Sequence, residues 1–235
     1  MKKLRIYASF LTFSLLLSFG VYAQSDSTKV LIDSLGKRTI INNTARLRIG
    51  VDISYPIRYI FDKDIKAFEV VADYRLKRNK WFIAAEGGYA EGMQVDSALS
   101  YTSKGPYIKI GVDRLVSCSK KRPNNIFYIG GRYCFSSTTT TVNSYTITSS
   151  HWPNSTSGSL PSETGSVQSI EGLVGIKVEM FKHFFMGWTA FIGYPVSNNK
   201  PEGFDNLFIP GIGFRNDPIF GFNYTLSFTL PTGKK

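Results

Sequence analysis

Cysteine and histidine are both scarce in this chain, which limits the chemistry that it can carry. The 235 residues include two cysteines and two histidines. Structural zinc sites are built from about four such ligands held close together. We therefore expect no metal site made of Cys and His, and the sequence contains no pattern that indicates a cofactor.

Long apolar runs are also missing after the first two dozen residues. No later stretch reaches the roughly 18 apolar residues of a membrane-spanning helix. Residues 1–23 carry Lys2, Lys3 and Arg5, then an apolar run over 6–17, and end in Ala23. This order is typical of a secretory signal peptide, with cleavage expected before Gln24. The alternative, an uncleaved anchor, is disfavoured because the run is short for a bilayer span.

Acidic residues are fewer than basic ones, which leaves a formal net charge of +11. Loss of the signal peptide removes three positive charges. An exported chain rarely meets nucleic acid, and no run of five basic residues is present. We therefore expect no nucleic-acid partner, and interpret the charge as attraction to anionic lipid head groups or acidic partners.

Apolar and polar residues alternate with a period of two in many parts of the chain, and most clearly over residues 220–230. Phe220, Phe222, Tyr224 and three further apolar residues alternate with glycine and polar residues. Such alternation predicts a strand with one apolar face. Its length suits a transmembrane β-strand, which needs about 9 to 11 residues.

Seven more stretches show similar alternation, although 184–194 is apolar on both faces. They cover residues 45–54, 66–76, 80–90, 106–115, 126–135, 169–180 and 184–194. The joins between successive stretches alternate strictly between long and short, as in barrels with long external loops and tight periplasmic turns. The sequence predicts an all-β fold, an eight-stranded antiparallel up-and-down transmembrane β-barrel over 45–235. Both termini would be periplasmic, the loops extracellular, and 24–44 a periplasmic arm.

Charged residues on one face of nearly every strand separate this barrel from a soluble one. A lipocalin-like barrel turns apolar side chains inward, whereas a membrane barrel has a polar lumen. Eight strands leave room for little more than side chains, so we expect a salt-bridged plug; a narrow pore is the alternative. The predicted lumen set is Arg46, Arg48, Asp52, Glu69, Asp73, Arg75, Glu86, Lys109, Asp113, Arg132, Glu171, Lys177 and Glu179.

Catalysis would depend on one of the two histidines. His183 falls in a tight turn and is expected to be an exposed turn residue. His151 lies among serines in the long stretch 136–168, which makes a hydrolase conceivable. No Gly-x-Ser-x-Gly motif accompanies it, so we expect no enzyme and no catalytic residue.

The two cysteines are expected to remain free thiols. Cys118 is predicted in a periplasmic turn, and Cys134 nine residues from the start of its strand. At about 3.3 Å per residue, reduced by strand tilt, their separation of roughly 20 Å exceeds disulfide range.

Two loops stand out. Residues 136–168 are rich in Ser and Thr, which favours mobility, yet β-prone Thr, Tyr and Ile suggest that both arms extend the hairpin beyond the membrane. The last loop carries the apolar residues Phe204, Leu207, Phe208 and Ile209. These side chains predict either an interaction surface or a lid on the barrel mouth.

Five segments give the chain a family resemblance: 52–57 (DISYPI), 103–113 (SKGPYIKIGVD), 143–147 (NSYTI), 204–211 (FDNLFIPG) and 221–227 (GFNYTLS). They resemble a family of outer-membrane proteins of Bacteroidota-type bacteria that is classed as a domain of unknown function. The resemblance implies a barrel fold and an outer-membrane location, and carries over no catalytic motif.

A filled lumen and patterned loops leave interaction as the main expected use. We expect a non-enzymatic scaffold or accessory subunit of a multi-protein envelope complex, for example one for outer-membrane protein assembly or surface-protein export. Its partners would be outer-membrane lipid and other envelope proteins. The alternatives are a lipid-modifying enzyme that uses the His151 loop, or a narrow pore.

Overall fold

Eight strands form one antiparallel sheet that closes on itself. The computed structural model describes residues 47–61, 63–76, 80–96, 98–118, 124–147, 156–198, 207–214 and 218–230. The chain divides into units 1–43 and 44–235, and every described residue belongs to the second. The predicted signal peptide and the arm over 24–44 therefore lie outside the described residues.

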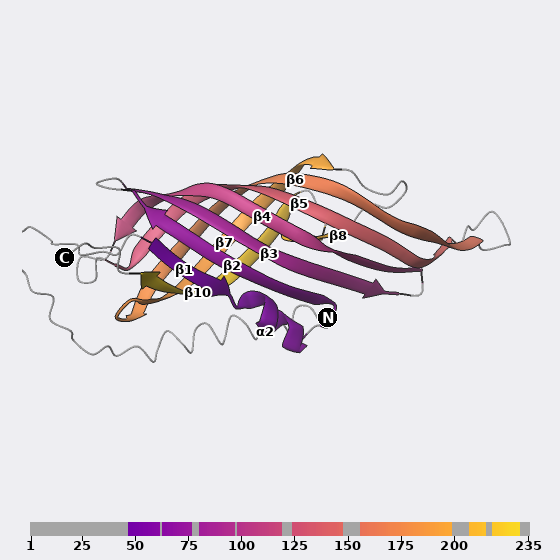
Figure 1. Cartoon of the computed structure of the whole chain (residues 1–235), viewed down its shortest axis with the longest axis horizontal. Coiled ribbons are helices and arrows are strands. Elements are labelled where there is room, and N and C mark those ends of the chain that lie inside the picture. The colour runs from indigo at the N-terminus through magenta and orange to yellow at the C-terminus, as the bar shows by residue number, and fades with distance from the viewer. Residues whose placement is uncertain are drawn as a thin grey trace, which may run out of the picture. The chain divides into compact units, whose positions relative to one another are not determined.

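The strand order around the closed sheet is β1-β10-β7-β6-β5-β4-β3-β2, and Figure 1 shows the strands side by side. Every neighbouring pair is antiparallel, which confirms the predicted closed eight-stranded sheet. The strands are β1 (Leu47–Asp52), β2 (Ile65–Arg75), β3 (Trp81–Val95), β4 (Leu99–Cys118), β5 (Ile126–Ile147), β6 (Thr156–Phe181), β7 (Phe184–Asn198) and β10 (Ile219–Leu230).

The period of two decides which face of the sheet points inward. On β4, Lys109 and Asp113 are buried, whereas the alternate residues Ile108, Ile110 and Val112 are about half exposed. Successive side chains on a strand must point to opposite faces. The polar residues therefore line the interior and the apolar residues form the outer wall.

The two ends of the barrel differ in their connections. At one end, here called the turn end, short joins connect β2 to β3, β4 to β5 and β6 to β7. The last is the two-residue turn Lys182-His183, in which His183 has a positive φ of 69° and is half-buried. The turn position is as predicted for His183, but full exposure is not.

At the other end, here called the extended end, several strands run past the predicted boundaries. The sequence predicted strands over 106–115 and 126–135, but β4 begins at Leu99 and β5 continues to Ile147. β5 and β6 remain paired up to Ile147 and Thr156, and Figure 1 shows this hairpin projecting furthest. The expectation that the arms of the 136–168 loop extend the hairpin is confirmed.

The wall has one interruption, beside the short strand β1. β1 pairs with residues 70–74 of β2 and 225–230 of β10. Residues 65–69 and 219–223 of these two strands lie beyond its end. The helix α2 (Ser54–Phe61) follows β1 directly at this point and contacts both strands. The sequence analysis assigned this segment to a loop, so the helix is a correction.

A small hairpin fills the extended end of the lumen. It consists of β8 (Phe208–Ile209) and β9 (Gly213–Phe214), joined by a turn through Pro210 and Gly211. Gly211 adopts a positive φ of 74°, and a Cβ there would lie 2.3 Å from the Tyr107 ring. Only glycine satisfies both requirements without strain. We call residues 207–214 the mouth hairpin.

Among the described residues, no helix combines the length and apolar character needed to cross a membrane.

Candidate functional site: the charged lumen

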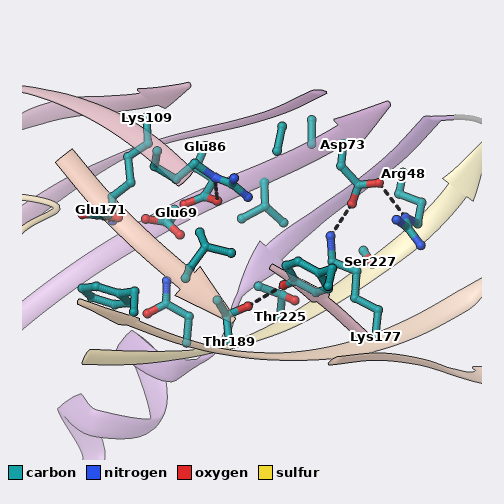
Figure 2. A pocket seen from close by; sticks show the side chains of 18 residues that line it. Arg48, Glu69, Asp73, Glu86, Lys109, Glu171, Lys177, Thr189, Thr225 and Ser227 are labelled. Atoms are coloured by element: carbon teal, nitrogen blue, oxygen red, sulfur yellow. Dashed lines mark hydrogen bonds and ion pairs between the residues drawn. The ribbon is translucent and has the colours of Figure 1, made fainter. Parts of the chain in front are cut away.

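Asp73 on β2 is the centre of one ion cluster in the lumen. One carboxylate oxygen accepts a hydrogen bond from Arg48 Nε at 2.7 Å, and the other from Lys177 Nζ at 2.7 Å. Arg48 belongs to the neighbouring strand β1, whereas Lys177 reaches across from β6 (Figure 2). One carboxylate thereby ties together two sides of the barrel.

Arg132 on β5 is the centre of a second cluster. Its Nη1 and Nη2 donate to the two Asp113 oxygens at 2.6 and 3.1 Å, and its Nε donates to Glu86 at 2.8 Å. Such a two-pronged contact matches the planar guanidinium to a carboxylate and fixes its orientation. Three strands, β3, β4 and β5, are cross-linked in this way through one side chain.

A third contact joins Lys109 on β4 to Glu171 on β6, over the intervening strand β5. The Lys109 Nζ lies 3.1 and 3.2 Å from the two Glu171 oxygens, and the Lys109 residue is only 1% exposed. The ammonium also lies 5.1 Å from the centre of the Phe191 ring. A buried charge needs such partners because desolvation is costly.

Near the extended end, the carboxylates of Glu69 and Asp52 accept hydrogen bonds from hydroxyl and N–H groups and not from cations. Tyr107 donates to Glu69 at 2.7 Å, and the Tyr55 side chain of α2 is hydrogen-bonded to Tyr107. The Asp52 carboxylate accepts the backbone N–H of Ser54 at 2.7 Å and its hydroxyl at 2.6 Å. Asp52 therefore caps the first turn of α2 from the end of β1.

The space that remains between these groups is small. Glu69, Lys109, Lys177 and other lumen residues line a cavity of about 40 Å³. This volume suits a few water molecules, whereas small-molecule pockets typically measure about 300 to 1,000 Å³. The arrangement can hold the wall together, but it offers little room for a substrate.

Ten residues of the predicted lumen set take part in these contacts. They are Arg48, Asp52, Glu69, Asp73, Glu86, Lys109, Asp113, Arg132, Glu171 and Lys177. Arg75 lies 5.7 Å from the centre of the Phe82 ring. Glu179 differs from the rest, because it accepts hydrogen bonds from Asn124 and the His183 N–H at the turn end. Arg46 lies outside the described residues.

The last loop was predicted to form either an interaction surface or a lid on the barrel mouth, and in the structure it packs as a lid. Leu207, Phe208 and Ile209 are all buried in the mouth hairpin. Leu207 and Phe208 pack with Tyr101 and Tyr107, and the Phe208 N–H donates to the Tyr101 hydroxyl oxygen at 3.2 Å. Burial raises the pKa of Tyr101, which keeps its hydroxyl protonated. These three residues are therefore not an exposed interaction surface, while Phe204 lies outside the described residues.

The predicted lumen set names charged residues alone and omits the tyrosines that complete the lumen. Tyr107 and Tyr128 point inward among the charges, and Tyr128 is hydrogen-bonded to Thr189 at 2.7 Å. Tyr107 lies two residues before Lys109, and Tyr128 lies four residues before Arg132. Each tyrosine therefore shares the inward face of its strand with a predicted lumen residue, so the alternation could have identified it.

Cys134 is a buried free thiol, as predicted. Strand register places it opposite Lys109, nine residues along β4 from Cys118. The Cys118 side chain and the whole of His151 lie outside the described residues.

Comparison with protein families agrees with the resemblance seen in the five segments. Comparison with curated proteins gives no match. A family described as a domain of unknown function, DUF6048, matches residues 4–235. This match covers nearly the whole chain, and the protein therefore belongs to the DUF6048 family.

Proposed function

We propose that this protein is an integral barrel of the bacterial outer membrane that serves as a non-enzymatic scaffold or accessory subunit of a multi-protein envelope complex. The observation that carries the location is the arrangement of the wall, with charges inside and large apolar side chains outside. Soluble monomers rarely expose continuous apolar patches beyond a few hundred Å². A lipid environment removes that cost.

The dimensions of the apolar wall agree with this location. On β5 the exposed residues Phe127 and Phe135 are eight residues apart. This separation is about 26 Å along the strand, or roughly 20 Å across a membrane at the tilt typical of barrels. The apolar band of outer-membrane barrels is about 25 Å tall.

Aromatic residues also cluster near both ends of the wall, as the interfacial girdles of such barrels do. Exposed aromatics near the turn end are Tyr74, Trp81, Phe127 and Phe181, and those near the extended end are Phe68, Tyr89, Phe135 and Phe220. The short joins at the turn end and the long projecting strands at the extended end support the former as the periplasmic side and the latter as the extracellular side.

Two features favour a scaffold over transport or catalysis. The lumen ion pairs and the mouth hairpin leave little internal space, which argues against a pore with a continuous wet path. The β4, β5 and β6 strands project beyond the barrel and provide a paired, rigid surface. Such a surface can hold a partner protein outside the membrane.

The location is tested by fractionation and by electrophoresis. We expect the protein to stay with outer membranes through a carbonate wash, and to migrate differently before and after boiling, as closed membrane barrels do. Release by carbonate would contradict the membrane location.

The scaffold role is tested by a mild-detergent pull-down of the tagged protein from native membranes, followed by mass spectrometry. We expect stoichiometric recovery of a defined set of envelope proteins. A variant with the hairpin residues 138–165 replaced by a short Asn-Gly turn provides the control, because it removes the projecting β5 and β6 arms and keeps the pairing of Ser137 with Ser166 in the barrel strands. Recovery of the barrel alone from the native protein would contradict the role.

The two other functions have their own tests. A lipid-modification assay with a His151→Ala variant examines the enzyme, and full activity of that variant would exclude His151. Planar-bilayer recordings examine the pore, for which discrete conductance steps are required.

A further inference from the structure

The interruption beside β1 is unlike the rest of the wall. Elsewhere strand pairs with strand along the apolar band, but here α2 stands between residues 65–69 of β2 and 219–223 of β10. A membrane barrel satisfies its backbone through pairing of neighbouring strands. The outer surface at α2 therefore has a different shape and composition from a plain strand wall.

Two cations lie on this surface, one on α2 itself and one on the neighbouring strand β2. The Arg58 guanidinium lies 4.8 Å from the centre of the Phe222 ring on β10. On the other side, the Lys66 ammonium of β2 lies 5.8 Å from the centre of the Tyr59 ring. Both aromatic rings face outward, so both cations lie on the outside of the barrel. Contact with a ring face leaves their N–H donors available to another group.

Within the part of the chain that the structure describes, neither cation forms a salt bridge. The ion pairs found there all lie in the lumen and involve Arg48, Lys109, Arg132 and Lys177. Asp64, in the turn after α2, has its own interaction within the protein. Within the described residues, Arg58 and Lys66 therefore offer charged groups without a salt bridge, and strand register places Glu91 of β3 opposite Lys66.

Large apolar side chains surround these cations. Ile60 of α2 and Phe220 of β10 are each 73% exposed, and Phe68 of β2 is 58% exposed. Phe68 is the next outward-facing residue after Lys66 toward the middle of the apolar band. Phe68 therefore lies below Lys66 along the wall, whereas Phe220 lies beyond the Phe222 ring toward the extended end, so exposed apolar side chains lie on both sides of the cations.

We propose that this surface, made of Arg58, Tyr59, Ile60, Lys66, Phe68 and Phe220, binds a net-anionic, phosphate-bearing membrane lipid. Arg58 and Lys66 hold the phosphate, because guanidinium and ammonium groups both pair with phosphate oxygens. Phe68, Phe220 and Ile60 lie along the acyl chains. Cations next to exposed apolar side chains suit a lipid, because a lipid carries a charged head group and acyl chains in one molecule. This inference rests on the proposed membrane location.

The test uses the full chain purified in mild detergent. Native mass spectrometry counts bound lipid after addition of palmitoyl-oleoyl phosphatidylglycerol or phosphatidylcholine, which share acyl chains and differ in net charge. We expect the native protein to prefer phosphatidylglycerol. The Arg58→Gln/Lys66→Gln double variant should bind it about tenfold more weakly, since each surface cation contributes to the attraction of anionic lipid.

Matched variants separate this site from general charge effects. Arg114→Gln also removes a cation above an aromatic ring, because Arg114 lies 5.7 Å from the centre of the Trp81 ring near the turn end. We expect it to bind phosphatidylglycerol as the native protein does. The charge-conserving Arg58→Lys/Lys66→Arg variant should also retain most of the preference. Phe68→Ser/Phe220→Ser should weaken binding of both lipids, because it removes contacts to the acyl chains.

The outcomes distinguish the two proposals. Each variant is first checked for the heat-dependent migration of a closed barrel. If the native protein fails this check and does not partition into membranes, the location and the lipid site are both overturned. If it passes, and the Arg58→Gln/Lys66→Gln variant binds phosphatidylglycerol as the native protein does, the lipid site alone is overturned. Displacement of the lipid by millimolar inorganic phosphate would also overturn it, because a free anion would then be the preferred ligand.

Discussion

The middle of the lumen and its mouth are filled by opposite means. In the middle, single charged residues such as Asp73 and Arg132 each bind partners on more than one strand. At the mouth, Phe208 and Ile209 belong to a hairpin that packs its apolar side chains against the inner wall. The first arrangement is made by the wall itself, whereas the second is added by a separate segment. A barrel can therefore lose the mouth hairpin and remain closed, but loss of a central ion pair affects several strands together.

The largest effect is expected from Arg132→Met, which tests the central arrangement. It leaves Glu86 and Asp113 buried without their cation, and breaking a buried ion pair in this way costs about 3 to 5 kcal/mol. We expect the free energy of unfolding to fall by about that amount. Urea titration in detergent micelles, followed by tryptophan fluorescence, measures it.

A triple variant, Arg132→Met/Glu86→Gln/Asp113→Asn, provides the control because it also removes the two negative charges that Arg132→Met leaves without a cation. We expect it to recover at least half of the lost stability. A triple variant as unstable as Arg132→Met alone would show that packing, rather than charge, accounts for the loss.

The next effect concerns the mouth, where Cys134 serves as a native reporter. Its thiol is buried in one cluster with Ile209, Ile212 and Ile219. In a Cys118→Ser background, Ile212→Asp places a charge in that cluster and should displace the mouth hairpin, since an unpaired buried charge is costly. We expect Cys134 to react with a methanethiosulfonate reagent at least about tenfold faster, while the barrel stays closed.

Val95→Asp in the same background is the matched control, because Val95 is apolar but exposed near the same end. Its labelling rate should equal that of the parent. If Ile212→Asp opened the barrel as well, as judged by heat-dependent migration, the mouth and the middle would not be independent.

A smaller effect is expected from Tyr101→Phe, which removes the hydroxyl that accepts the Phe208 N–H. Loss of one such partner leaves a buried donor unpaired and costs about 1 kcal/mol or slightly more. Hydrogen exchange of the mouth hairpin should accelerate correspondingly, with no change in the urea midpoint. An unchanged exchange rate would show that packing alone holds the hairpin.

The smallest effect is expected from Thr139→Ala in the projecting part of β5. Thr139 and Thr164 are exposed, and their hydroxyls lie 3.0 Å apart across β5 and β6. Such cross-strand pairs contribute about 0.2 to 1 kcal/mol. We expect a loss near the lower limit in the urea titration. A loss as large as that of Arg132→Met would mean that the projecting hairpin, rather than the lumen, stabilises the barrel.

The sequence predicted the middle of the barrel well because one physical rule governs it. Alternation of apolar and polar residues between Phe127 and Phe135, for example, requires one face in lipid or a core and the other in a polar interior. Beyond the apolar band both faces of a strand can be polar, so the alternation of apolar and polar residues no longer identifies a strand. Beyond Ser136, both faces of β5 are rich in Ser and Thr, so β-propensity predicted a longer hairpin, but only the pairing with β4 and β6 shows where the strand ends.

The mouth hairpin and α2 could be predicted less well, for different reasons. Phe208 and Ile209 are apolar residues in a loop, and sequence alone does not say whether such residues turn into a lumen or out to a partner. The segment that forms α2 falls in the join between two predicted strands, where the period of two gives no information on a helix. Its helix depends on Asp52 as a cap and on the space that β1 leaves by ending early.

The meeting of β1 and β10 has a consequence for how the barrel forms. β1 and β10 are the first and last strands of the closed sheet, and Leu47 pairs with Leu230. They share six register pairs, whereas β3 and β4 share fifteen. Contacts between residues so distant in sequence form late, because the entropy of closing the chain must be overcome first. We therefore expect closure through β1 to be the slow step of folding, and β1 to be where the finished barrel first reopens.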